Sequence, residues 1–407
     1  MNKNRVFASK LVEVVHMTMP LESSDKTFAE YFAGIGLVRF ALEAEGWTAR
    51  FANDIDPDKK ATYIKNFAAE EFVLGDINSL SPRDIPTTFL ATASFPCTDL
   101  SLAGAREGLN GAESGTLWSF LGIIEKMKSR APKLLSLENV PGFLSSHGGR
   151  DFRAAIEKMN SLGYACDAVL LNAAHFVPQS RQRLFILGVK RDIALPYETV
   201  NDPSLLMEHL ARPDQLLRTL CASSGLEWRF RRFLGSLGNS RKALSDVMEE
   251  IPYYSPLWWN AKRTSHLLGQ LSERHAVMVS HLKTSPRETW ATVYKRMRGG
   301  HIRAEVRADG VAGCLRTPRG GSSKQFVMRL GKGQLRVRHM TPREYARLQG
   351  APDSFKFDEN TNKALFGFGD AVCVPAVRWL ARQLINPIAD ALAQSEPKKE
   401  LAISGAL

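Results

Sequence analysis

Short apolar runs alternate with helical periodicity over the first half of the chain. The runs have the length of strands that are buried on both faces of a sheet. They occupy residues 27–32, 48–52, 72–74, 89–93, 134–137, 168–172 and 184–189. Between them, apolar residues recur at helical spacing, which predicts helices over 38–44, 57–67, 116–128 and 151–162. This alternation predicts an α/β fold with a mixed, mostly parallel sheet.

The alternation stops near Arg191 and resumes near Thr341. Residues 191–280 carry aromatic clusters and turn residues instead. Thr341 and Glu344 then form the pattern of a helix capping box, with Pro342 in the first turn. We therefore expect one discontinuous domain with a smaller module inserted in it. The predicted limits are 26–190 plus 336–395 for the outer domain, 191–335 for the insert, and 1–25 and 396–407 for terminal tails.

Nearly all of the net charge lies in one segment of the insert. The chain of 407 residues has a formal net charge of +12, and residues 281–340 alone hold fourteen Lys and Arg against three acidic residues. A solvated surface would spread both signs evenly. A segment this one-sided predicts a face that binds nucleic acid phosphates.

Composition excludes several classes of protein. No apolar run approaches the roughly 18 to 20 residues of a membrane span, and the polar, basic N-terminus is unlike a signal peptide. The five cysteines are scattered without a C-x-x-C pair, so we expect reduced thiols and no metal site. A cytoplasmic protein without a membrane partner is expected.

Chemically useful residues follow five of the predicted strands. In chain order they are Gly34 and Gly36, Asp54, Asp76, Cys97 and Glu138. Because strands of an open α/β sheet end at one ligand-binding crevice, we expect these residues to lie together. The glycine turn suits a nucleotide, and an acid about 20 residues further on suits ribose hydroxyls. Arg39 stands where a dinucleotide fingerprint has its third glycine, which disfavours NAD and FAD.

Two features of the sequence each allow two interpretations. Cys97 could be a reactive thiol at a strand end, but a lone cysteine is more often an inert apolar residue. Arg181 and Arg183 alternate on one face of an extended segment. That pair could reach a common anion or be surface charge at the edge of the sheet.

Seven ordered motifs remove much of this ambiguity. They are Phe32-Ala33-Gly34-Ile35-Gly36, Gly75-Asp76-Ile77, Phe95-Pro96-Cys97, Glu138-Asn139-Val140, Gln179-Ser180-Arg181-Gln182-Arg183, Thr341-Pro342-Arg343-Glu344 with Arg347-Leu348-Gln349-Gly350, and Gly367-Phe368-Gly369-Asp370-Ala371-Val372. With these motifs the chain resembles a cytosine-C5 DNA methyltransferase of the prokaryotic type over nearly all of residues 27–384. The resemblance implies a Rossmann-like class I methyltransferase domain, with the insert at 191–335 as its target-recognition domain.

The resemblance also implies roles for the catalytic residues. Cys97 would add to C6 of a flipped-out cytosine, which makes C5 able to accept a methyl group. Glu138 would hold a proton toward N3 of the base. Arg181 and Arg183 would contact the base O2 and a phosphate, or support the cysteine pocket. The glycine-rich loop at 104–115 would close over the base.

Two further sets of residues follow from the resemblance. S-adenosylmethionine, the implied methyl donor, would be bound by Phe32, Gly34, Gly36, Asp54, Ile55, Asp76, Pro96, Leu117, Asp370 and Val372. Double-stranded DNA would be contacted by Ser101, Arg296, Arg298, Arg303, Arg316, Arg319 and Lys324.

The chain departs from the family pattern at four positions. Asp370 replaces the usual asparagine, which places a negative charge near the donor's methionine end or between the domains. Thr98 replaces a glutamine, Cys314 a threonine, and Ile55 a larger side chain. None of these changes removes a catalytic group, so we expect activity.

Alternative functions remain open at this stage. A tRNA cytosine methyltransferase is disfavoured by the large basic insert, an inactive DNA-binding relative by the intact catalytic residues, and a nicotinamide dehydrogenase by the missing glycine. We expect a monomer that acts on the nucleoid in a restriction-modification or related defence system. A separate restriction endonuclease could accompany it.

Overall fold

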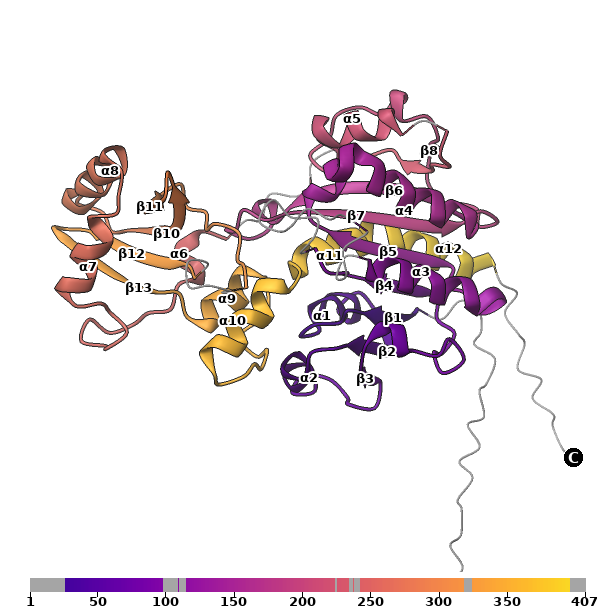
Figure 1. Ribbon diagram of the computed structural model, residues 1–407, viewed down its shortest axis with the longest axis horizontal. Coiled ribbons are helices and arrows are strands. Elements are labelled where there is room, and N and C mark those ends of the chain that lie inside the picture. Colours follow the sequence, from indigo (N-terminus) through magenta and orange to yellow (C-terminus); the bar gives the residue numbers. More distant parts are fainter. Residues whose placement is uncertain are drawn as a thin grey trace, which may run out of the picture.

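The computed structural model describes residues 26–97, 109, 115–223, 225–233, 237, 242–317 and 324–395. Two lobes are visible: a large one with a central sheet between helices, and a small one built on a second sheet (Figure 1). Segments from both ends of the chain meet in the large lobe, so it is discontinuous in sequence.

The large sheet has seven strands in the order β3-β2-β1-β4-β5-β7-β6. All neighbouring pairs are parallel except those of β7, which runs antiparallel between β5 and β6. The predicted α/β fold with a mixed, mostly parallel sheet is therefore confirmed. The strands are β1 (Thr27–Tyr31), β2 (Thr48–Asp54), β3 (Phe72–Leu74), β4 (Leu90–Ala93), β5 (Leu134–Asn139), β6 (Tyr164–Asn172) and β7 (Gln182–Lys190).

Helices cover both faces of this sheet because successive strand residues point to opposite sides. On β1, Phe28 packs into the core beneath one helical layer, whereas Ala29 packs into the core beneath the other. The first layer contains α1 (Leu37–Glu43), α11 (Val374–Leu380) and α12 (Asn386–Ser395), and the second contains α3 (Thr116–Met127) and α4 (Arg150–Ser161).

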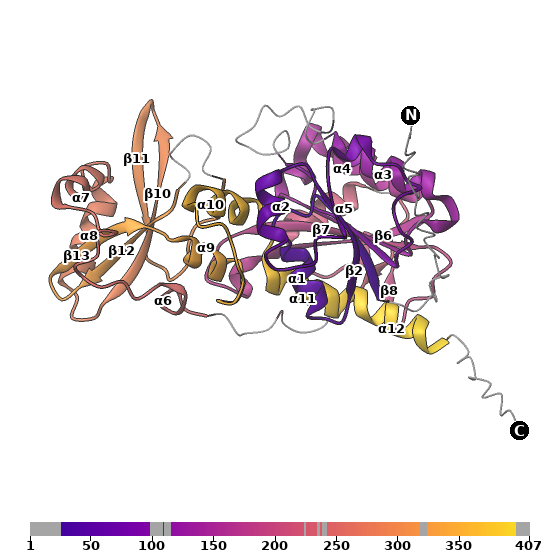
Figure 2. The ribbon, with the colours of Figure 1, turned by 90° about the horizontal axis from the view of Figure 1, so that it is seen from below.

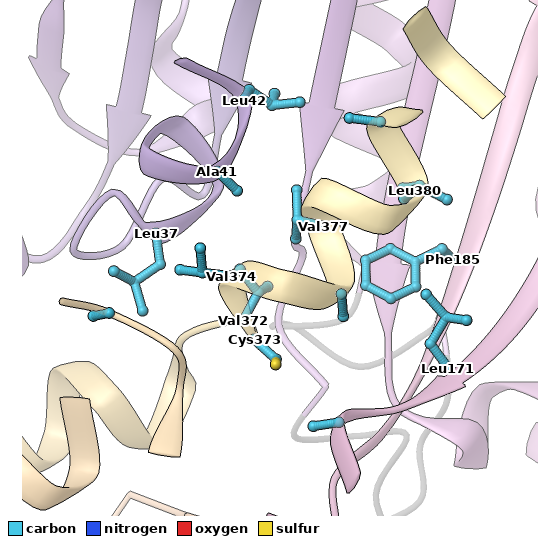
Figure 3. Packing of buried hydrophobic residues seen from close by; sticks show 14 of the residues in the cluster. Leu37, Ala41, Leu42, Leu171, Phe185, Val372, Cys373, Val374, Val377 and Leu380 are labelled. Atoms are coloured by element: carbon cyan, nitrogen blue, oxygen red, sulfur yellow. The ribbon is translucent and has the colours of Figure 1, made fainter. Parts of the chain in front are cut away.

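Helix α11 packs beside α1 on the same face of the sheet and ties the C-terminal segment to the N-terminal half (Figure 3). Val377 packs among Leu37 of α1 and Phe185 of β7, and all three side chains are buried. Each such side chain contributes about 1.5 to 3 kcal/mol by leaving water. A π-helical turn at Ala381–Ile385 joins α11 to α12.

Three shorter helices follow, the last two of which lie between the two sheets (Figure 1). Helix α2 (Pro57–Tyr63) begins at Asp56, whose side chain accepts hydrogen bonds from the Asp58 and Lys59 amides, and it ends earlier than predicted. The capping box is confirmed at the start of α9 (Pro342–Leu348). Helix α10 (Thr361–Asp370) follows.

The small lobe holds a four-stranded antiparallel sheet in the order β11-β10-β12-β13. One face of the sheet shares a core with two helices. Strands β10 and β11 form a long hairpin that projects from the lobe (Figure 2). The elements are α6 (Leu244–Val247), α7 (Ala261–Leu268), α8 (Glu273–Thr284), β10 (Thr289–Arg298), β11 (His301–Arg307), β12 (Phe326–Gly331) and β13 (Gln334–His339).

Packing places the borders of the insert elsewhere than the predicted 191–335. The segment with β8 (Thr199–Val200), α5 (Asp214–Ala222) and β9 (Phe230–Arg231) lies against β6 of the large sheet. There the Leu170 amide donates to the Ala211 carbonyl oxygen, 2.8 Å away. At the other end, β13 continues past residue 335. The change in sequence pattern at 191 marks the end of the βαβ alternation, not the end of the lobe.

Within the described residues, one helical stretch, Thr361–Ser395, is long and apolar enough to cross a membrane by length and composition alone. Its apolar window is 67% buried inside the protein. This degree of burial is typical of helices in the core of a protein.

Candidate active site

The residues predicted to act together meet at one edge of the large sheet. The parallel strands end there, and the antiparallel strand β7 begins there. As a result Glu138, near the end of β5, lies beside Arg183, near the start of β7. The Arg183 Nε donates to Glu138 Oε1 over 2.9 Å, and both side chains are largely buried.

Cys97 is held at this edge by an asparagine from the neighbouring strand. The Asn139 side chain is buried and donates from Nδ2 to the Phe95 carbonyl oxygen, 3.1 Å away. This bond fixes the backbone of the Phe95-Pro96-Cys97 turn, and Cys97 itself is partly exposed. Sequence reasoning gave Asn139 no role, although it stands inside a motif.

Burial governs the ionisation of Glu138. Removal from water raises the pKa of the carboxyl group above its usual range, and the charges of Arg183 and Arg181 only partly oppose this. A carboxyl group in such a setting can be protonated when a base approaches it.

The two cysteines near the site have opposite electrostatic environments. Burial raises the pKa of the Cys97 thiol; Arg183 opposes this, whereas Glu138 and Asp370 reinforce it. Cys314 is also buried, but Arg181 and Arg183 overcome that effect and lower its pKa. The Arg181 Nη1 lies 3.4 Å from the Cys314 sulfur. Of these two thiols, Cys314 is therefore the more acidic.

Arg181 and Arg183 are not surface charges, and in the structure they have different partners. Arg183 pairs with Glu138. Arg181 is 2% exposed, and its guanidinium donates to the carbonyl oxygens of Leu315, 2.8 Å away, and Ala371, 2.7 Å away. Arg181 therefore joins β7 to the small lobe and to the segment after α10.

A second buried side chain and a glycine complete this junction. Gln179 accepts from the Leu315 amide over 3.1 Å and donates to the Leu348 carbonyl oxygen over 2.8 Å. Gly369 lies so close to the small lobe that a Cβ there would be 2.5 Å from the Thr317 nitrogen. Sequence reasoning assigned no role to Gln179, since its partners are far away in the sequence.

Several predicted donor-binding residues lie together where β1 and β2 end. Phe32, Gly34 and Gly36 all have positive φ, so the backbone turns sharply between β1 and α1. The Gly34 amide donates to Asp54 Oδ2 over 2.8 Å, and a Cβ at Gly34 would meet no atom within 4 Å. Ile55 is 66% exposed. An open glycine turn, a buried carboxylate and an apolar platform fit a nucleoside with a ribose and a flat base.

The other predicted donor residues are placed differently. Asp76 caps a turn, where its side chain accepts from the Asn78 amide over 2.8 Å. Pro96 is partly exposed beside Cys97. Leu117 and Val372 are buried in the two cores and do not line an open surface.

A sequence profile described as C-5 cytosine-specific DNA methylase matches residues 26–386. The chain belongs to this family. It is 28% identical over 362 residues to the type II methyltransferase M.HaeII of Haemophilus aegyptius. The aligned region covers 88% of this chain and 92% of M.HaeII. The chain is 26% identical over 358 residues to the type II methyltransferase M.HhaI of Haemophilus parahaemolyticus, and the aligned region covers 87% of this chain and 92% of M.HhaI. The protein is a DNA (cytosine-5-)-methyltransferase, and the resemblance drawn from its motifs is confirmed.

Solved structures support the fold of the methyltransferase. The Dnmt2 methyltransferase of S. pombe superposes with a TM-score of 0.57 at 18% identity, covering 89% of this chain and 99% of that one. The Entamoeba histolytica methyltransferase EhMeth gives 0.55 at 14% identity, covering 90% and 99%. At these identities the likeness concerns the fold alone.

The predicted DNA-binding residues of the methyltransferase fall into three groups. Arg296, Arg303 and Arg316 are exposed, and Arg296 pairs with Arg303 across the β10–β11 hairpin. Lys324 is engaged by Asn362 of α10, 2.8 Å away. Ser101, Arg319, the side chain of Arg298 and most of the 104–115 loop, together with Thr98, lie outside the described part of the chain.

No group of three or more His, Cys, Asp or Glu side chains that could hold a metal ion occurs among the residues that the structure describes.

Alkylation of the ligand-free protein should separate the two active-site thiols. Because burial and carboxylates raise the pKa of Cys97, its reaction with iodoacetamide should accelerate about tenfold per pH unit from neutral to beyond the ordinary cysteine pKa. Cys314, whose pKa is lowered by two arginines, should reach its plateau at lower pH. Peptide mass spectrometry measures both rates, with exposed Cys221 as a control for the reagent. If the Cys97 rate levels off at a lower pH than the Cys314 rate, the predicted order of the two thiol pKa values is wrong.

Replacing Arg181 with methionine should destabilise the methyltransferase by about 3 kcal/mol, since it leaves several buried carbonyl oxygens without their donor. Urea unfolding measures this change. Arg218→Met, at an exposed ion pair on α5, should have little effect. Equal stability of the two variants would show that the junction does not depend on Arg181.

Proposed function

We propose that this methyltransferase methylates C5 of a cytosine that it flips out of double-stranded DNA, through a covalent bond between the Cys97 sulfur and C6. The observation that carries the proposal is the placement of one arginine, Arg183, beside both Cys97 and Glu138. S-adenosylmethionine would lie against Gly34, Asp54 and Ile55 and supplies an electrophilic methyl group when bound.

The charges suggest how the thiol loses its proton. Glu138 and Cys97 compete for Arg183, and the Glu138 charge raises the pKa of Cys97. If Glu138 takes up the thiol proton and donates it toward N3 of the cytosine, its negative charge disappears and Arg183 can stabilise the thiolate. The exchange needs no net gain or loss of a proton. It fits a site that is inert until a base enters.

The covalent steps then balance as follows. The thiolate forms a bond to C6, and the C5=C6 electron pair becomes available at C5. C5 then bonds to the methyl group, whose bond to the donor sulfur breaks with its electron pair, so that S-adenosylhomocysteine would leave. Loss of the C5 proton to a base returns the electron pair between C5 and C6, and Cys97 leaves as thiolate. Water could serve as that base, since no side chain of the site is assigned to this step.

The biological setting is proposed from the relatives. M.HaeII and M.HhaI are named as type II methyltransferases. We place this enzyme likewise in a restriction-modification system, on the nucleoid in the cytoplasm, with any endonuclease as a separate protein. Cys97, Glu138 and Arg183 all come from one chain, which supports action as a monomer.

Incubation with labelled S-adenosylmethionine and either duplex DNA or tRNA tests the proposed substrate. We expect label in DNA only, and bisulfite sequencing of DNA from expressing cells should then show 5-methylcytosine in one sequence context. Transfer to tRNA, or no protected cytosine, would overturn the proposal.

The β10–β11 hairpin is our candidate for a DNA phosphate contact. Each arginine bound to a phosphate contributes close to one unit to the slope of log binding constant against log salt. Replacing Arg296 and Arg303 with alanine should therefore flatten this slope by about 2. Fluorescence anisotropy with a duplex at several salt concentrations measures it. Arg218→Ala on α5 is the control, and an unchanged slope in the double variant would remove the hairpin from the interface.

A further inference from the structure

A second thiol, that of Cys314, lies against the two arginines of the active site. Arg181 donates from Nη1 to the Cys314 sulfur over 3.4 Å, and the Arg183 guanidinium also interacts with this sulfur. The thiol itself donates to the Leu315 carbonyl oxygen, 3.4 Å away. The proposed methyl transfer uses Arg183 but gives Cys314 no task. Because the family pattern has a threonine at this position, the sulfur is a feature of this chain.

The surroundings of this sulfur favour an anion. Glu138 pairs with Arg183, whereas the printed hydrogen bonds of Arg181 go to carbonyl oxygens and to the Cys314 sulfur. The buried Nε of Arg181 has no acceptor among the residues that the structure describes. Burial and the charge of Arg183 lower the pKa of Arg181, so the two guanidiniums repel each other. Negative charge placed between them is therefore stabilised.

A purely structural role does not require sulfur at this position. A threonine hydroxyl would donate to the Leu315 carbonyl oxygen more strongly than a thiol does. Cys373 shows the contrasting case of a packed thiol, since burial raises its pKa to about 12. Cys314 instead is partly exposed, and the arginines lower its pKa. A partly exposed thiol in electropositive surroundings is the setting of cysteines that are readily oxidised.

We propose that Cys314 is a modification site for hydrogen peroxide and that its oxidation reversibly stops methyl transfer. The thiolate sulfur forms a bond to one peroxide oxygen, and the O–O bond breaks. The other oxygen leaves as hydroxide and takes up the proton that the thiol released, which gives water. Sulfur is thereby oxidised to a sulfenic acid and peroxide is reduced. An added thiol displaces water from the sulfenic acid to form a mixed disulfide, and a second thiol then releases Cys314 in its reduced form.

The added oxygen acts on the active site through Arg183. In the reduced enzyme this arginine pairs with Glu138 and lowers the pKa of Cys97. The sulfenate oxygen of Cys314 is a better acceptor than the thiol and competes with both for the guanidinium. With Arg183 drawn away, the Cys97 thiolate is less stable and adds to the base more slowly. This effect on catalysis rests on the proposed function, whereas the oxidation itself does not.

Trapping with dimedone, which reacts with sulfenic acids, locates the oxidised sulfur. The full-length protein is treated with a limiting amount of hydrogen peroxide in the presence of dimedone, and its peptides are measured by mass spectrometry. Cys314 should be labelled about tenfold or more faster than Cys97, whose pKa is raised, and than the exposed Cys221. Labelling of Cys97 or Cys221 ahead of Cys314 would overturn the proposal.

Methyl transfer to duplex DNA after peroxide treatment measures the consequence, with each variant compared to its own untreated activity. Cys314→Thr, and Cys314→Ser as the smaller change, should lose activity about tenfold more slowly than the unaltered enzyme. Dithiothreitol should restore the unaltered enzyme. Cys221→Ser is the control and should be inactivated as the unaltered enzyme is.

The outcomes separate this inference from the proposed function. Equal loss of activity in the Cys314 variants would assign the inactivation to another residue, such as Cys97, and overturn the switch. Loss that dithiothreitol cannot repair would overturn its reversibility. An unaltered protein without any methyl transfer would overturn the proposed function, while the order of dimedone labelling would still decide whether Cys314 is the oxidised site.

Discussion

Cys97→Ser should lower methyl transfer to duplex DNA by a factor on the order of 10³ or more and abolish covalent capture of the substrate. A serine hydroxyl at this position is a far weaker nucleophile than a thiolate. The same burial and carboxylates that raise the pKa of the thiol would keep a hydroxyl protonated. We do not expect Cys314 to substitute, because its sulfur is engaged by the Arg181 Nη1, 3.4 Å away.

Capture on DNA that carries 5-fluorocytosine measures this directly. Fluorine at C5 cannot leave as a proton does, so the adduct between Cys97 and C6 persists and shifts the protein on a denaturing gel. Cys221→Ser, at an exposed position on α5, should trap as the unaltered enzyme does. An adduct formed by Cys97→Ala would assign the nucleophile to another residue.

The sequence predicted the parts of this enzyme that depend on local pattern. Strands β1 to β5 follow from short apolar runs, and their polar C-terminal residues follow from the rule that ligands bind where parallel strands end. The apolar runs and this rule were sufficient to predict that Cys97 and Glu138 lie at the ends of neighbouring strands. The capping box at Thr341 was likewise visible, since its two residues are three positions apart.

Contacts between distant segments could not be predicted in this way. Arg181 and Leu315 are 134 positions apart, and no periodicity links a guanidinium just before β7 to a carbonyl group in the small lobe. The same holds for Asn139, which supports the cysteine turn, and for Lys59, whose partner lies at the end of α10. The sequence left open whether both arginines reach one anion or are surface charge. Packing decided that only Arg183 faces the carboxylate, while Arg181 is used between the lobes.

The border of the insert likewise could not be predicted from local sequence pattern. Composition changes at residue 191, but burial against β6 continues through β9. Segment 199–231 has lost the βαβ pattern without leaving the domain. A change in pattern therefore marks where one kind of local structure ends, and only the packed structure shows where a domain ends.

Glu138→Gln should slow methyl transfer by about 10²-fold to 10⁴-fold while making Cys97 easier to alkylate. The amide can donate a hydrogen bond to N3 of the cytosine but cannot give up or receive a proton there. It also leaves Arg183 without its anionic partner.

The effect on Cys97 has a definite sign. Glu138 in its charged form raises the pKa of the thiol, and Arg183 lowers it. Removing the carboxylate leaves the arginine unopposed, so the pKa of Cys97 falls and the thiolate fraction at a given pH rises. Reaction with iodoacetamide in the absence of DNA should accelerate accordingly, in the same variant whose methyl transfer is slow.

This opposition of the two rates supports a proton-transfer role only in a folded variant. Unfolding would also expose Cys97 and remove the burial that raises its pKa, so urea unfolding must first show that Glu138→Gln is folded under the assay conditions. Glu125→Gln, at an exposed ion pair with Lys158, is the matched carboxylate control and should change neither rate. If Glu138→Gln alkylates more slowly than the unaltered enzyme, then Glu138 does not restrain the thiol, and the proposed exchange of a proton between the two residues is wrong.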